Sequence, residues 1–190
     1  TIGLSRNSTT ANPIYPRGGS IWNVSAKLTF PYSAFNGVDY GALRDERDGL
    51  VDFLAENPTS VDSQERIAEI DQQRFNWLEY YKIKFSGDWY TPLTNDLILR
   101  TRTEFGFLGA YNNDRGIPPF ERFFVGGDGL GAFSLDGREV IQLRGYPNQS
   151  LSTNDGNTIY NKFSLELRHP VTLSQLASIY VLAFAEGGAA

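Results

Sequence analysis

Apolar and polar residues alternate along the stretch from Ser20 to Phe30, without a break from Trp22 onward. A period of two is the pattern of a β-strand with one apolar and one polar face. The stretch has about the length that a strand needs to cross a membrane in a β-barrel. The apolar face carries Trp22, Val24, Ala26, Leu28 and Phe30, and the polar face carries Asn23, Ser25, Lys27 and Thr29.

Four later stretches show the same period less regularly, and each is predicted to be a strand. They cover Glu79–Tyr90, Leu97–Phe107, Asn161–Arg168 and Ile179–Glu186, the last with poor alternation. Thr91–Asp96 predicts a short turn, and His169-Pro170 predicts the opening of another. The fold class predicted is therefore all-β, with about five antiparallel strands.

The polar faces of these strands are unusually charged. In a soluble sandwich the apolar face points inward, whereas in a membrane barrel it faces lipid and the charged face lines the lumen. Alternation alone leaves both open, although aromatic residues near the strand ends fit an interfacial girdle. The charged positions are Lys82, Lys84, Arg100, Arg102, Glu104, Glu166 and Arg168.

Residues 31–76 differ from the strands. Leu50, Phe53 and Leu54, and later Ile67 and Ile70, recur at helical spacing, and Ser63 is a candidate cap for the second helix. The segment holds ten acidic and four basic residues, a net charge of −6. We expect a partly helical acidic insert, either a solvated surface loop or a docking surface for a partner.

A long glycine-rich connection from Gly126 to Asn157 contains the sequence Gln142-Leu143-Arg144-Gly145-Tyr146. Long connections in compact sheet proteins are uncommon and usually functional. A buried arginine needs an anionic partner, because an unpaired charge away from water is costly. Glu166 and Glu186 lie on the two strands that follow, so we expect a loop folded back and held by these acids.

Composition disfavours several classes of protein and site. The 190 residues suffice for one domain, and no apolar run reaches the roughly 18 residues of a membrane helix. Cysteine is absent and histidine occurs once, which disfavours disulfides and the usual zinc sites. No basic patch suggests a nucleic acid partner. The chain opens in mid-pattern without Met, so we interpret it as a segment of a longer polypeptide.

Four possible sites are weighed and disfavoured. Gly126–Gly131 lacks the Gly-Lys-Ser/Thr ending of a phosphate loop and reads as a loop base where glycine permits positive φ. Glu166 and Glu186 could pair as in a glycosidase. Calcium ligation by Asp128, Asp136 and Asp155 lacks any known spacing. His169 reads as a turn residue.

Four ordered segments resemble the BamA family of outer-membrane protein assembly factors, in the form found in Bacteroidetes-type bacteria. Each segment alone is weak, but the set is fairly specific in its order and gaps. The segments are Pro119–Gly127, Leu143-Arg144-Gly145-Tyr146, Ser164–Pro170 and Tyr180–Gly188.

The resemblance implies part of a sixteen-stranded transmembrane barrel that periplasmic POTRA domains precede. Residues 1–190 would be a partial barrel domain, with 31–76 as an extracellular insert and 108–158 as a loop folded inward. The family's loop motif falls on Arg144, Gly145 and Tyr146, and its acidic partners fall on Glu166 and Glu186. At Glu186 the family more often has an aspartate.

The function implied is that of a non-enzymatic assembly factor without a cofactor, located in the outer membrane of a Gram-negative bacterium. Its partners would be unfolded outer-membrane precursors, accessory subunits of the assembly complex and the lipid bilayer. The alternatives are a polypeptide-secretion relative with the same loop, a porin, a soluble β-sandwich that binds carbohydrate, and a glycosidase.

Overall fold

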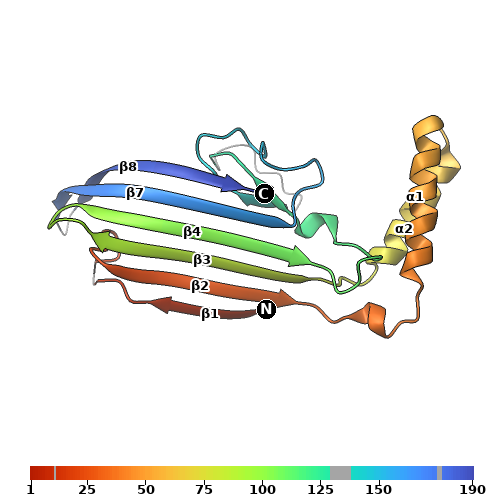
Figure 1. Ribbon diagram of the computed structural model, residues 1–190, viewed down its shortest axis with the longest axis horizontal. Coiled ribbons are helices and arrows are strands. Elements are labelled where there is room, and N and C mark those ends of the chain that lie inside the picture. Colours follow the sequence, from red (N-terminus) through yellow and green to blue (C-terminus); the bar gives the residue numbers. More distant parts are fainter. Residues whose placement is uncertain (11, 129–137, 175–176) are drawn as a thin grey trace. The chain divides into compact units, whose positions relative to one another are not determined.

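The computed structural model describes residues 1–10, 12–128, 138–174 and 177–190, and most of its strands form one sheet. The order in this six-stranded sheet is β1-β2-β3-β4-β7-β8, so each strand lies beside the next one along the chain except that β5 and β6 come between β4 and β7 (Figure 1). The strands are β1 (Ile2–Asn7), β2 (Gly19–Leu28), β3 (Tyr81–Pro92), β4 (Ile98–Gly109), β7 (Ile159–Leu173) and β8 (Ser178–Ala189).

The sheet is antiparallel and open, which confirms the predicted fold class. It contains the five expected strands together with β1, which the alternation analysis did not identify. Register places charged residues of the polar face side by side. On β4 and β7, Arg100 lies opposite Glu166 and Glu104 lies opposite Lys162. Such cross-strand pairs of opposite charge stabilise a sheet.

The prediction of a turn at His169-Pro170 is wrong. Strand β7 continues to Leu173, and Pro170 lies opposite Tyr180 within the ladder. The pairing with β8 shifts register between Pro170 and Thr172. A proline has no N–H to donate to the ladder, so a strand accepts one where the ladder is already irregular. His169 is therefore an exposed strand residue rather than a turn residue.

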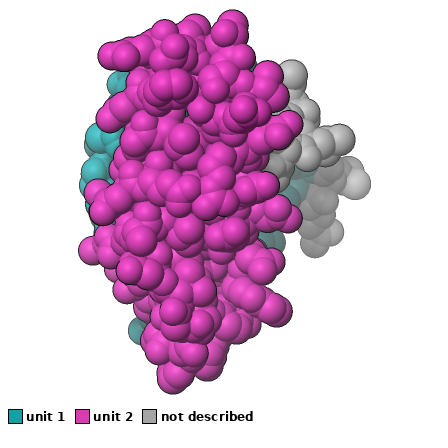
Figure 2. Space-filling view, turned by 90° about the vertical axis from the view of Figure 1, so that its right-hand side faces the viewer, with its two compact units in different colours: residues 1–27, 82–107, 120–190 teal, residues 28–81, 108–119 magenta. Residues whose placement is uncertain are grey.

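The described chain divides into two compact units, which Figure 2 colours separately. Unit 1 comprises residues 1–27, 82–107 and 120–190, and it holds most of the sheet. Unit 2 comprises residues 28–81 and 108–119. The segment 108–158, expected to act as one loop, is thus shared between the units.

Unit 2 contains the predicted helices, α1 (Tyr40–Glu56) and α2 (Val61–Phe75), preceded by a short 3-10 helix η1 (Tyr32–Ala34). Asp39 caps α1 by accepting a hydrogen bond from the Ala42 N–H at 3.0 Å. The cap predicted for α2 is wrong by three residues, because Ser60 occupies the N-cap position and Ser63 is buried in the first turn. None of the helices among the described residues is long and apolar enough to span a membrane.

A buried ion pair joins the two parts of unit 2. Arg115 donates from Nη1 to Glu79 Oε2 at 2.7 Å, and both side chains are almost fully buried. Arg115 also donates from Nε to the Arg74 carbonyl at 2.6 Å, while Ser33 donates its N–H and hydroxyl to Glu79. The segment 108–119 is therefore fixed to the helical insert by a buried charge pair, although Arg115 Nη2 has no hydrogen-bond partner among the described residues.

The remaining elements of unit 1 lie in the connection between β4 and β7. A short 3-10 helix η2 (Pro119–Glu121) leads into β5 (Phe123–Val125), which pairs in parallel with β6 (Glu139–Ile141). Gly126 and Gly127 follow β5 with φ of 122° and 99°. The positive φ expected at this loop base is confirmed for these two glycines. We refer to residues 120–157 as the Arg144 loop.

Candidate functional site

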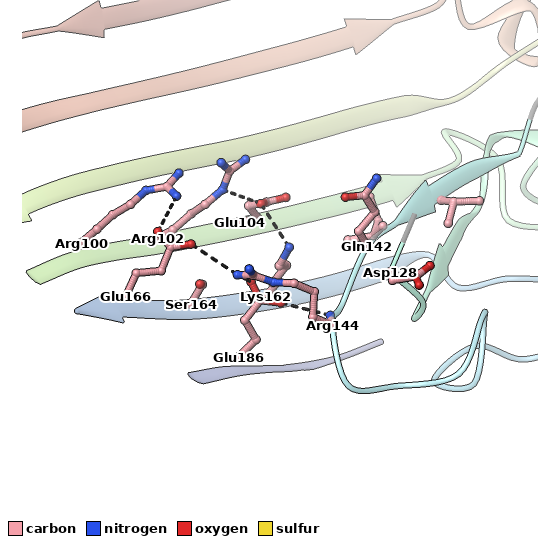
Figure 3. A pocket seen from close by; sticks show the side chains of 12 residues that line it. Arg100, Arg102, Glu104, Asp128, Gln142, Arg144, Lys162, Ser164, Glu166 and Glu186 are labelled. Carbon is pink, nitrogen blue, oxygen red and sulfur yellow. Dashed lines mark hydrogen bonds and ion pairs between the residues drawn. The ribbon is translucent and has the colours of Figure 1, made fainter. Parts of the chain in front are cut away.

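Arg144 lies just after β6 and contacts the sheet directly. Its Nη2 donates to Glu186 Oε1 at 2.5 Å and to Glu166 Oε1 at 3.3 Å (Figure 3). Its backbone N–H donates to the other oxygen of Glu186 at 3.1 Å. One arginine therefore reaches acids on two neighbouring strands, and Glu186 is held by both the backbone and the side chain.

The strands place these acids side by side. Glu186 of β8 lies opposite Ser164 of β7, and Phe184 lies opposite Glu166. The guanidinium of Arg144 stands 3.8 Å from the centroid of the Phe184 ring, within the range of a cation–π contact. The longer glutamate at position 186 thus reaches Arg144, although the resembling family more often has an aspartate there.

The two acids in this contact are much more buried than Arg144. The Glu186 and Glu166 side chains are only 4% and 7% exposed, whereas Arg144 is 38% exposed. The hydrogen bond to Glu186 raises the pKa of Arg144, although partial burial opposes it. Charge-assisted bonds of this kind are about twice as strong as neutral ones. Arg144 therefore stays charged, and the buried Glu186 depends on it for compensation.

Glu166 belongs to a chain of ion pairs along the polar face. Its Oε2 accepts hydrogen bonds from Arg100 Nη1 at 3.0 Å and from Arg168 Nε at 2.9 Å. Arg100 in turn donates from Nε to Asp88 at 2.6 Å. Positive and negative side chains alternate along β3, β4 and β7, so the buried charges are paired with charges of opposite sign. This charged face of the sheet, which we call the wall, is therefore a rigid acceptor for Arg144.

Gly145 and Tyr146 contribute backbone geometry. Gly145 has φ of 88°, which favours glycine over other residues. The Tyr146 carbonyl accepts the Gly127 N–H at 3.1 Å, and the Leu143 N–H donates to the Gly127 carbonyl at 2.8 Å. These bonds fold the loop around Arg144, while the Tyr146 side chain stays partly exposed.

A polar cavity of about 430 Å³ borders Arg144. Its lining balances four cationic side chains against four anionic ones, so it has no net charge that would select an ionic ligand. The cations are Arg100, Arg102, Arg144 and Lys162, and the anions are Glu104, Asp128, Glu166 and Glu186.

The other candidate sites gain no support. Glu166 and Glu186, weighed as a glycosidase pair, are both engaged by Arg144, which suits a structural role. The structure groups no three potential metal ligands among the residues it describes. Of the calcium candidates, Asp128 and Asp155 are exposed, and Asp136 lies outside the described residues. Gly129, Leu130 and Gly131 of the possible phosphate loop also lie outside them.

The fold is that of a segment of an outer-membrane β-barrel. The Omp85 superfamily domain matches residues 2–190, so the chain belongs to the Omp85 superfamily. This membership places the protein in the outer membrane of a Gram-negative bacterium.

A solved structure shares this fold. The crystal structure of BamA from Haemophilus ducreyi lacking POTRA domains 1–3 aligns with 98% of this chain at a TM-score of 0.59 and 16% identity. At that identity the likeness concerns the fold. The chain spans 28% of that relative, so it corresponds to part of a barrel. Comparison with curated protein sequences returns no match.

Proposed function

We propose that this chain is part of the barrel of an outer-membrane protein assembly factor, in which the Arg144 loop is locked against the barrel wall. The contact of Arg144 with Glu186 and Glu166 carries the proposal. We name these three residues, with Gly145 and Tyr146, the loop lock. The barrel would help β-barrel precursors fold and insert into the membrane, without catalysing a covalent reaction.

The energetics support a lock. Hydrogen bonds to a charged group contribute about 1.5–3 kcal/mol, and loss of Arg144 would leave Glu186 buried without them. Glu186 would lose both its side-chain and, on loop displacement, its backbone donor. The loop therefore has one strongly preferred position, which is what a barrel that must present a fixed inner surface to a precursor requires.

The proposed partners follow from this role. They are unfolded outer-membrane protein precursors, accessory subunits of an assembly complex and the surrounding lipid bilayer. Residues 31–76 would form an extracellular acidic insert, and the polar face of the sheet would line the lumen. Membership of the Omp85 superfamily supports this assignment over a passive porin or a soluble sandwich.

Depletion of the full-length protein in its own bacterium tests the function. Loss of an assembly factor should reduce many folded outer-membrane barrels together, as measured by heat-modifiable mobility across the outer-membrane proteome. A secretion relative would instead reduce the release of one polypeptide or a few. A porin would lower solute uptake and leave the other barrels folded, and either of these results would overturn the proposal.

A further inference from the structure

The Arg144 loop makes a second contact with the sheet, on β3 rather than on β7 and β8. Lys82 of β3 is almost fully buried, with its side chain 5% exposed. Its Nζ donates to the Glu121 carbonyl at 2.8 Å and lies 2.5 Å from Glu139 Oε2 and 3.3 Å from Glu121 Oε2. Lysine is seldom buried unless it is paired, so this position depends on the two loop acids.

An aromatic side chain of the loop completes the contact. Phe123 is fully buried, and the ammonium of Lys82 lies 4.5 Å from the centroid of its ring. Phe123 also packs edge-on against Tyr160 of β7 at 4.7 Å between centroids. Gly106 of β4 leaves the room for this packing, because a Cβ there would stand 2.2 Å from Tyr160 and 2.9 Å from Phe123.

The two contacts have opposite polarity. At the first, the loop supplies the cation, Arg144, and the wall supplies the acids. At the second, the wall supplies Lys82, and the loop supplies Glu121 and Glu139, which lie before β5 and at the start of β6. Because Lys82 contacts both acids, it ties the N-terminal ends of the parallel strands β5 and β6 to one strand of the sheet.

Two further lysines surround this contact. Lys84 of β3 donates to Glu139 Oε1 at 2.9 Å, and Lys27 of β2 donates to Glu121 Oε1 at 2.7 Å. Both are more than two-fifths exposed, so solvent screens them more than it screens Lys82. Lys82 is therefore the residue on which the contact chiefly depends.

We propose that Lys82 is a second positioning residue of the Arg144 loop, so that the loop is held by two anchors on different strands. Its importance for assembly rests on the function proposed above. The Lys82 anchor holds the β5–β6 unit, and the loop lock holds the segment around Arg144. Release of Arg144 then frees only its own segment, and the loop does not leave the wall as a whole.

Hydrogen exchange on the purified full-length protein tests this arrangement. In Lys82→Met, we expect amides of residues 120–128 and 138–141 to exchange about tenfold faster or more, because the loop acids lose their buried partner. Residues 142–152 should stay within about twofold of the unaltered protein. Arg144→Ala should give the reverse pattern.

Lys27→Gln is the matched control, since it removes an exposed lysine from the same acid and should change neither segment. If Lys82→Met fails to fold, Glu139→Gln tests the same anchor more gently, and heat-modifiable mobility shows whether the barrel is intact. Lys82→Arg, which keeps the charge, should restore slow exchange in residues 120–128.

Unchanged exchange in Lys82→Met would overturn the proposal, and so would release of both segments by Arg144→Ala alone. The exchange pattern does not depend on assembly activity. If the exchange pattern shows two anchors but the protein assembles no barrels, the proposed function is refuted and the role of Lys82 in holding the loop is still supported.

Discussion

Glu186 accepts two hydrogen bonds from a single residue, the backbone N–H of Arg144 at 3.1 Å and its guanidinium at 2.5 Å. The acid therefore fixes both the course of the chain at position 144 and the direction of its side chain. This double contact explains how one carboxylate on β8 orders the segment around Arg144 within a long loop.

The first prediction concerns the coupling of this pair. Glu186→Gln should destabilise the loop by about 1.5–3 kcal/mol, because hydrogen bonds to a charged group contribute that much. Glu186→Asp should keep most of the contact, since it preserves the charge. In a double-mutant cycle with Arg144→Ala, the interaction energy should be about 0.5–3 kcal/mol. Additive effects would show that the two side chains act separately.

The second prediction concerns the buried pair of unit 2. Arg115→Met should destabilise residues 40–75 by about 3–5 kcal/mol, because it leaves Glu79 buried without its charged partner. The effect is measured as faster hydrogen exchange or proteolysis of α1 and α2. The control is Arg44→Gln, whose pair with Asp114 is about half exposed and should contribute about 0–1 kcal/mol. Equal effects of the two substitutions would contradict the account.

The third prediction concerns pH and the Lys82 anchor. Burial favours a higher pKa for Glu139, but hydrogen bonds from Lys82 and Lys84 outweigh it and lower the pKa below the ordinary value of a glutamate. A carboxylate whose pKa is lowered by folding stabilises the folded state fully above its unfolded pKa. That contribution disappears as the pH falls through the folded pKa.

Residues 138–141 should therefore exchange more slowly in the unaltered protein than in Glu139→Gln at pH 6 to 7, after correction for intrinsic rates. The difference between the two proteins should shrink as the pH is lowered well below about 4.3, the ordinary glutamate value. A difference that stays constant from neutral to acid pH would show that the charge of Glu139 does not stabilise the anchor.

Much of the sheet could be predicted from sequence, because charged and apolar faces alternate over long stretches. Strand β1 escaped because it is only six residues long and alternates Ile2, Leu4 and Arg6, which mixes an arginine into the apolar face. Strands β5 and β6 were not predicted because three residues each are too few to show a period. Pro170 misled because a proline usually ends a strand, whereas here the ladder shifts register to accept it.

The two anchors differ in how much the sequence reveals. The acids near Arg144 were expected from a motif, Arg144-Gly145-Tyr146, and from the order of the following strands. Lys82 carried no such signal, since it looked like one charge among many on a polar face. Its partners, Glu121 and Glu139, lie in a segment without periodicity, so only the folded loop brings the three together.

The most direct measurement of the central claim is the level of folded outer-membrane barrels in cells whose only copy of the full-length protein carries Arg144→Ala. We expect a clear fall in those barrels, together with protease cleavage of residues 142–152 in the intact membrane. Arg17→Ala is the control, because its ion pair with Asp96 is long, at 3.9 Å, and exposed. Normal barrel levels and an uncleaved loop in Arg144→Ala would contradict the account.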